Sequence, residues 1–285
     1  MLEFISGRRA PGNYHMSRLS PDDWHERFSQ QARWTANLRN HLYSRAGLEN
    51  AHRILEVGCG TGALLVELAR KPPTRPIVII DRTGQINIRP DLAVHGLDLD
   101  RPYLSLARRY APTSLLVQGD AHGLPYAEGS FDLIFCHFLL LWVRDASKVI
   151  AEMRRLLCPG RSLLALAEPD YGGRIDYPTE LAEIGRQQEE ALRRQGVDTR
   201  IGRRLKSLFT QAGFRDVEVG VLGAQWEEAP SQAELQMEWD VLENDLDEFV
   251  SQSELKRLQA VDKDAWQRGK RVLFVPTFYA WGKKA

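Results

Sequence analysis

Cysteine is scarce and scattered in this 285-residue chain, which contains only Cys59, Cys136 and Cys158. No CxxC pair is present, and no histidine cluster stands at metal-ligand spacing, so a disulfide framework or a structural zinc site is not expected. We therefore expect no bound metal. Such cysteine usage is typical of a reducing compartment, and we expect a cytoplasmic protein.

The chain also lacks an excess of charge, because 38 Lys and Arg balance 38 Asp and Glu. Broad electrostatic attraction to nucleic acid is therefore not expected. The longest apolar run, residues 131–143, is interrupted by Asp132 and His137 and is too short to span a bilayer. The N-terminus has no signal-peptide core. These absences predict a soluble protein with a small-molecule partner, and they leave the oligomeric state open.

What is present is a glycine-rich turn at residues 54–62, between a predicted strand and a predicted helix. The apolar strand passes Glu56 and breaks into Gly58, Gly60 and Gly62. Because glycine has no Cβ, a ligand can approach the backbone N–H groups of such a turn and the N-terminus of the helix behind it. This arrangement suits a nucleotide-like ligand.

Strands and helices alternate from residue 54 to residue 167, which predicts right-handed crossovers and a mostly parallel sheet. Ligands on such sheets bind beyond the carboxyl ends of the strands. The predicted strands end in polar residues, namely Glu56, Asp98, Asp120, His137 and Glu168 with Asp170. We therefore expect these strand ends to share one cleft.

The flanking segments predict a division of the chain into four parts. Residues 1–50 are an arm and helices that cover the cleft, and residues 51–225 are the α/β core. Residues 226–270 are a helical insertion that forms a lid, and residues 271–285 are the final strand of the core. Pro276 suggests an edge position or a bend in that strand, which we expect to run from Arg271 to Trp281.

Two acids compete for the sugar hydroxyls of a nucleotide. Asp81 ends a β-rich run about twenty residues after the glycines, which is where a nicotinamide dinucleotide site places its ribose acid. Gly58 to Ala63 also satisfies the dinucleotide fingerprint with Ala in the last place. Asp98 lies further along, and an exposed acid in a hairpin turn is the alternative role for Asp81. The residues alone leave both acids open.

Several segments together resemble the class I S-adenosylmethionine-dependent methyltransferases of the small-molecule type. They stand in the family's order and extend over about residues 50–220: Glu56-Val-Gly-Cys-Gly-Thr-Gly62, Gly96-Leu-Asp-Leu-Asp100, Gly119-Asp120-Ala121, Ser130-Phe-Asp-Leu-Ile-Phe135 and Glu152-Met-Arg-Arg-Leu-Leu-Cys-Pro-Gly160. The resemblance implies an α/β, Rossmann-like doubly wound, mostly parallel seven-stranded sheet with an antiparallel last strand, plus N-terminal helices and a helical lid insertion.

The same resemblance implies S-adenosyl-L-methionine as methyl donor and S-adenosyl-L-homocysteine as product. Glu56 would lie near the methionine ammonium, Asp98 would accept hydrogen bonds from the ribose hydroxyls, and Asp120 would accept one from the adenine amino group. The residues implied to bind the cofactor are Glu56, Gly58, Gly60, Gly62, Asp98, Leu99, Asp120, Ala121, Cys136 and His137.

The implied reaction is in-line methyl transfer to an O, N or C nucleophile of a small molecule. An acceptor hydroxyl or acidic carbon needs a base, for which His137 is the candidate and a cleft contact is the alternative role. Weaker candidates are His122, Glu168, Asp170 and Tyr171. Aromatic faces near the sulfonium add cation–π attraction of about 1 kcal/mol, and the candidates are Trp34, Phe138 and Trp142, unless they only pack in the core.

The lid helices would determine which acceptor is methylated. Trp226, Met237 and Trp239 are candidates for its apolar lining, although the same stripe could hold the lid in place. Two other functions stay open at this stage: an NAD(P)-dependent oxidoreductase that uses Asp81, and a non-catalytic S-adenosylmethionine-binding module.

Overall fold

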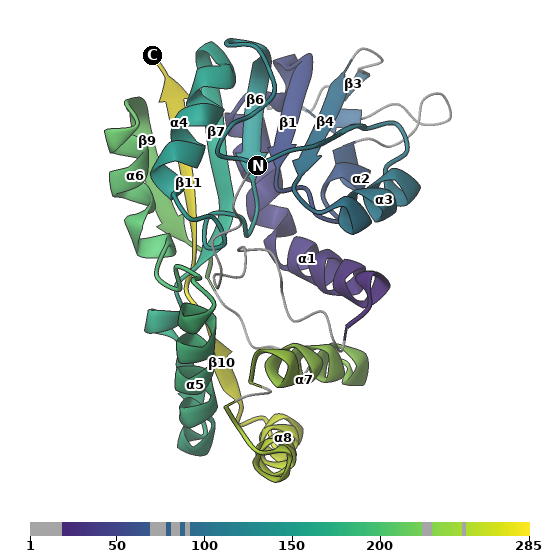
Figure 1. Ribbon diagram of the computed structural model, residues 1–285, viewed down its shortest axis with the longest axis vertical. Helices are drawn as coiled ribbons and strands as arrows, with labels where there is room; N and C mark the ends of the chain where they lie inside the picture. The colour runs from purple at the N-terminus through teal and green to yellow at the C-terminus, as the bar shows by residue number, and fades with distance from the viewer. Residues whose placement is uncertain (1–18, 69–77, 81–85, 89–91, 224–229, 247–248) are drawn as a thin grey trace, which may run out of the picture.

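The computed structural model describes residues 19–68, 78–80, 86–88, 92–223, 230–246 and 249–285. Figure 1 shows a twisted sheet with helices on both faces and a group of helices beyond one end of the sheet. The main sheet consists of β1 (Arg53–Val57), β4 (Ala93–Asp98), β5 (Leu115–Gln118), β6 (Phe131–Cys136), β7 (Leu157–Pro169), β9 (Phe214–Val221) and β11 (Thr277–Lys284).

The seven strands lie in the order β5-β4-β1-β6-β7-β11-β9. β1 pairs in parallel with β4 and β6, and the pairs β4–β5 and β6–β7 are parallel as well. β11 lies between β7 and β9 and is antiparallel to both. The predicted Rossmann-like sheet with an antiparallel last strand is therefore confirmed.

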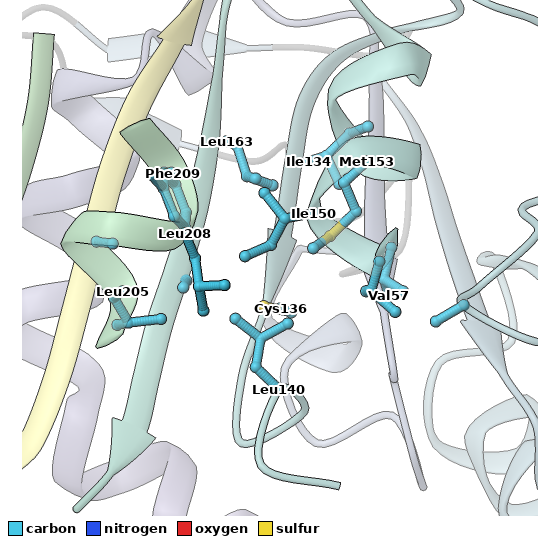
Figure 2. Close-up of a cluster of buried hydrophobic side chains, with 14 of the residues drawn as sticks. Val57, Ile134, Cys136, Leu140, Ile150, Met153, Leu163, Leu205, Leu208 and Phe209 are labelled. Carbon is cyan, nitrogen blue, oxygen red and sulfur yellow. The ribbon is translucent and has the colours of Figure 1, made fainter. Parts of the chain in front are cut away.

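Both faces of the sheet are covered by helices, as the unbroken apolar runs of the central strands require. On one face lie α4 (Ala146–Leu156) and α6 (Leu205–Gln211); on the other lie α1 (Pro21–Arg45), α2 (Leu65–Leu68) and α3 (Arg101–Tyr110). Figure 2 shows part of the hydrophobic core on the face that α4 and α6 cover. Ile150 and Met153 of α4 and Leu208 of α6 pack there on strand residues of β6 and β7.

The N-terminal segment forms one 25-residue helix, α1, where the sequence predicted helices that cover the cleft. Ser20 caps it: its Oγ accepts a hydrogen bond from the Asp23 N–H at 3.2 Å, and the Asp23 carboxylate accepts one from the Ser20 N–H at 2.7 Å. Pro21 occupies the first turn, where its missing N–H costs nothing. This capping box fixes where the helix begins.

A second helical layer stands beyond the carboxyl ends of the strands (Figure 1). It comprises α5 (Ala182–Arg194), α7 (Gln232–Leu246), α8 (Gln252–Gln267) and a two-stranded sheet of β8 (Ile175–Tyr177) and β10 (Val272–Phe274). The layer has its own core, in which Ile184 of α5 packs with Trp239 of α7 and Leu255 of α8. α5 thus joins the two predicted lid helices, and we call the whole layer the lid; the domain boundaries themselves stay a prediction.

The expectation of one closing strand from Arg271 to Trp281 was wrong. The segment divides into β10, which pairs with β8, and β11, which enters the main sheet. Pro276 lies between the two pieces and has no N–H to donate to a ladder, so the chain changes sheets there.

Short elements complete the described chain. β2 (Val78–Ile80) and β3 (Ile86–Ile88) pair antiparallel, which confirms the predicted hairpin, while its turn lies outside the described residues. Four 3-10 turns span Leu48–Asn50, Tyr171–Gly173, Thr179–Leu181 and Gly202–Arg204. None of the helices in the described part of the chain is long and apolar enough to cross a bilayer.

Candidate active site

A cavity of about 1880 Å³ lies between the carboxyl ends of the strands, α1 and the lid. Its lining includes four of the predicted strand-end residues, which are Glu56, Asp98, Asp120 and His137. Their strands β1, β4, β5 and β6 are neighbours in the sheet, so residues far apart in the chain meet at one edge. The structure therefore brings together four of the residues that the sequence assigned to one cleft, whereas Glu168 and Asp170 are not among the lining residues.

The glycine turn forms one wall of this cavity. Gly58, Gly60 and Gly62 have φ angles of +75°, +51° and +81°, in the left-handed region where glycine is favoured. Gly58 and Gly60 line the cavity. Gly62 does not; a Cβ there would lie 3.1 Å from the Cα of Ala107. Gly62 is thus needed for the close packing of α3 on the turn.

Glu56 carries the most unusual electrostatics in the cavity. Its side chain is 3% exposed, and Oε2 has no hydrogen-bond partner among the described residues. Burial raises the pKa of this carboxyl well above its ordinary value, although the guanidinium of Arg39 acts in the opposite direction. Arg39 is itself fully buried and binds the Glu67 carboxylate at 2.6 Å, so it is only a partial counter-charge for Glu56. A cationic group of a ligand would stabilise the ionised form of this buried carboxyl group.

Asp98 joins the end of β4 to the glycine turn. Its Oδ2 accepts a hydrogen bond from the Gly60 N–H at 2.7 Å, and its Oδ1 accepts one from the Asp100 N–H at 2.9 Å. Burial raises the pKa of Asp98, and these two backbone hydrogen bonds counteract that rise. Each carboxylate oxygen can accept a further hydrogen bond, so donors such as sugar hydroxyls could bind here.

A chain of two hydrogen bonds, which starts at Asp145 in front of α4, fixes the position of Asp120. The Asp145 N–H donates to Nε2 of His122 at 3.2 Å, so the other nitrogen, Nδ1, carries the proton that is donated to Asp120 Oδ1 at 2.6 Å. Burial raises the pKa of Asp120, but the hydrogen bonds from His122 outweigh it, and the net pKa lies below the ordinary value. His122, a weak candidate base in the sequence, is thus a hydrogen-bond partner of Asp120.

His137 lies at the end of β6 and contacts α1. Its Nε2 is 3.0 Å from the Thr35 Oγ1, and Thr35 in turn accepts a hydrogen bond from Arg39 at 2.6 Å. Burial, together with the charge of Arg39, lowers the pKa of His137 to about 3. The imidazole is therefore neutral at physiological pH.

Apolar side chains complete the cavity near these acids. Leu99 is 55% exposed although it is apolar, and it lines the cavity with the small, buried Ala121. Trp34, Phe138 and Trp142 also line it, and Trp34 is half exposed. These surfaces are available for packing against a planar ring.

Several candidates lie outside the cavity lining. Cys136 is fully buried among the core residues of Figure 2, and its thiol lies 3.8 Å from Glu168 Oε1. Glu168 is also buried, where it accepts hydrogen bonds from three backbone N–H groups, and Asp170 is paired with Arg203. Met237 is not among the lining residues, whereas Trp239 and Tyr171 are. Asp81 and Trp226 lie outside the described residues.

Three contributors from α1 were missed in the sequence: Thr35, Arg39 and His25, whose Nδ1 is 2.8 Å from the Thr61 Oγ1. Polar residues on one side of an amphipathic helix normally indicate a solvent-exposed face, so the sequence pattern did not predict that these residues lie at or near the cavity. Only the packing of α1 over the cavity identifies them.

In the part of the chain that the structure describes, no group of three or more His, Cys, Asp and Glu side chains could hold a metal ion.

Comparison with known proteins identifies the core. Residues 55–165 match the family described as methyltransferase domain. Methyltransferase GfsG of Streptomyces halstedii is 32% identical over 145 residues, which are 49% of this chain and 45% of the relative. Demethylmenaquinone methyltransferase of Deinococcus radiodurans is 34% identical over 121 residues, which are 41% of this chain and 43% of the relative.

The solved structures agree on the fold. An S-adenosylmethionine-dependent methyltransferase from Thermotoga maritima aligns over 95% of this chain and 99% of its own length, with a TM-score of 0.52 and 17% identity. The aligned part of this chain spans less than half the length of the curated relatives. The likeness therefore concerns the core of the chain.

Proposed function

We propose that the core of the chain belongs to the class I S-adenosylmethionine-dependent methyltransferases and that the protein transfers a methyl group from S-adenosylmethionine to a small-molecule acceptor. The supporting observation is the buried, unpartnered Oε2 of Glu56, which shares one cavity with the carboxylates of Asp98 and Asp120. An ammonium, a pair of ribose hydroxyls and an adenine amino group would satisfy these three acids in turn.

The arrangement of strands disfavours Asp81 as the ribose acid, which is the role that the nicotinamide alternative gave it. A dinucleotide site places its ribose acid at the end of the strand beside the first one. That strand is β4, which ends at Asp98, whereas Asp81 follows β2 of a separate two-stranded sheet. The competition between the two acids thus favours Asp98.

Bound S-adenosylmethionine supplies an electrophilic methyl group on its sulfonium. Glu56, Asp98 and Asp120 would orient it, and α1 with the lid would exclude water and align the acceptor. Such alignment is worth roughly 7–11 kcal/mol at its limit. The cavity extends from the strand ends to α5 and α7, which leaves room for a small acceptor on the lid side. One relative is named for methyl transfer to demethylmenaquinone, which is not a protein or a nucleic acid. This name supports a small molecule as the class of acceptor.

Binding of S-adenosylhomocysteine should release protons from Glu56, and Glu56→Gln should abolish that release. Burial raises the pKa of the Glu56 carboxyl and so favours its protonated form in the free protein, whereas a bound ammonium favours the carboxylate. Isothermal titration calorimetry in buffers of different ionisation enthalpy measures the proton count. We expect Glu56→Gln to weaken binding by about tenfold or more, as loss of one charge-assisted hydrogen bond implies. Equal proton release in both proteins would contradict this role for Glu56.

We propose that His137 acts on the acceptor side of the cavity. His137→Ala should lower turnover far more than it lowers affinity for S-adenosylhomocysteine, because Glu56, Asp98 and Asp120 remain. With a pKa of about 3, the imidazole stays unprotonated through the assay range, so turnover should not fall between pH 8 and pH 5 through its titration. Steady-state rates of S-adenosylhomocysteine formation over an acceptor panel, with calorimetric affinities, separate the two effects. Equal losses in turnover and affinity would argue against a role in the methyl transfer.

A further inference from the structure

The lid side of the cavity contains a buried charge cluster that the proposed methyl-donor site does not use. Arg27 pairs with Glu238 at 2.6 Å, and Arg271 pairs with Asp176 at 2.8 Å and with Asp262 at 2.5 Å. Arg174 also binds Asp176, at 2.6 Å. These three arginines and three acids balance one another.

Asp245 of α7 is a fourth acid with no cation of its own. It is 6% exposed and lines the cavity. Its Oδ2 accepts a hydrogen bond from the neutral amide of Gln188 at 2.8 Å, and its Oδ1 has no hydrogen-bond partner among the described residues. The neighbouring Asn244, also 6% exposed and lining the cavity, likewise leaves its Oδ1 unpartnered in the described chain. Two unmatched buried acceptors therefore lie at one place, and one of them can carry a negative charge.

Burial without a counter-charge destabilises the ionised form of a carboxyl group and raises its pKa, and Asp245 is such a group. Burial raises the pKa of Asp245 to about 6, against the lowering effects of the Gln188 hydrogen bond, the Arg27 charge and the side chain of Asn244. The groups that face it are Gln188 from α5, Arg27 from α1, Glu238 and Asn244 from α7, and Tyr171 from the 3-10 turn after β7. A bound cation would supply the missing counter-charge.

The helix α1 sets the distance between this cluster and the proposed reaction site. Thr35 contacts His137 at 3.0 Å, and Arg27 contacts Glu238 at 2.6 Å. The two α1 residues are eight positions apart, which is about 12 Å at a rise of 1.5 Å per residue. The Arg27–Glu238 pair, whose charges act on Asp245, is therefore separated from the Thr35–His137 contact by about two turns of α1.

We propose that Asp245 and Asn244 form an anchoring subsite for a protonated amine on the acceptor, at the end remote from the methylated atom. The inference rests on the proposed function for the identity of the acceptor, but the subsite binds its cation independently of methyl transfer. The acceptor is then an elongated organic amine, with an apolar portion that passes the aromatic lining at Phe138 and Trp142.

The test compares 4-phenylbutylamine with 4-phenylbutan-1-ol, which share a skeleton and differ in charge. Calorimetric titration into protein saturated with S-adenosylhomocysteine should show the amine binding at least about tenfold tighter, as one charge-assisted hydrogen bond predicts. Asp245→Asn should reduce that preference to within about twofold and leave alcohol binding unchanged. This variant should fold, because it removes a buried charge. The preference should also fall at pH 5, where Asp245 is protonated.

Asp240→Asn is the matched control, since Asp240 lies on the same helix outside the cavity lining and accepts a hydrogen bond from Gln236 at 2.8 Å. It should keep the amine preference. Equal binding of amine and alcohol to the unaltered protein, no amine binding, or a preference that survives Asp245→Asn would overturn the subsite. The titrations are repeated without S-adenosylhomocysteine: failure of that compound to bind would contradict the proposed function, while the amine preference still decides the subsite.

Discussion

Replacement of Asp98 by alanine should weaken S-adenosylhomocysteine binding by at least about 100-fold. The Asp98 carboxylate already accepts hydrogen bonds from the N–H groups of Gly60 and Asp100, and we expect it to accept the ribose hydroxyls as well. Hydrogen bonds to a charged group are each worth about 1.5–3 kcal/mol, and about 2.7 kcal/mol corresponds to 100-fold. The glycine turn would also lose the carboxylate that ties it to β4.

Calorimetric titration of the folded variant measures this effect. Asp98→Asn keeps one oxygen acceptor and should therefore show an intermediate loss of affinity. Asp264→Asn is a suitable surface control, because Asp264 is exposed and pairs with Arg268, the residue that follows the last residue of α8. A folded Asp98→Ala protein that binds within about threefold of the unaltered protein would remove Asp98 from the proposed cofactor site.

Glu168→Ala should lower the free energy of unfolding by about 3–5 kcal/mol. The Glu168 carboxylate is fully buried and accepts from the N–H groups of Leu139, Leu140 and Leu141 at 3.1, 3.0 and 3.3 Å. Each buried N–H that loses its acceptor costs about 1–3 kcal/mol. The same segment places Leu139 against Gly58, since a Cβ on that glycine would lie 2.7 Å from Leu139 Cδ1. The glycine turn should therefore loosen along with the segment.

Glu168→Gln separates the charge of this side chain from its hydrogen bonding. Burial raises the pKa of Glu168 from 4.5 to about 7, so the folded protein favours the protonated carboxyl. This contribution to stability is fully present below about pH 4.5 and is lost as the pH rises through 7, a change of about 3 kcal/mol. Urea unfolding should therefore show the advantage of Glu168 over Gln shrinking between pH 4.5 and pH 8. A pH-independent difference would contradict the raised pKa.

The sequence predicted where the strands end, but it did not predict into which layer each side chain near a strand end points. Cys136 and His137 are adjacent at the end of β6, and both were expected near the sulfonium. Successive side chains of a strand point to opposite faces, so Cys136 enters the core with Ile134 while His137 reaches the cavity. Likewise, Pro276 signalled a bend, but the pairing of β10 with β8 depends on a partner strand about a hundred residues earlier in the chain.

The sequence by itself determined the order of the strands and helices, the glycine turn and the acids at the strand ends, because these features are local and repeat the periods of regular structure. The tertiary structure alone decided what surrounds them. Thr35 meets His137 across 102 residues, and Arg27 meets Glu238 across 211. Such contacts arise when α1 and the lid pack over the sheet, and no local pattern encodes them. The acids proposed to bind the methyl donor therefore follow from local motifs, whereas the burial of Asp245 and the acceptor proposed for it depend on the packing of the lid.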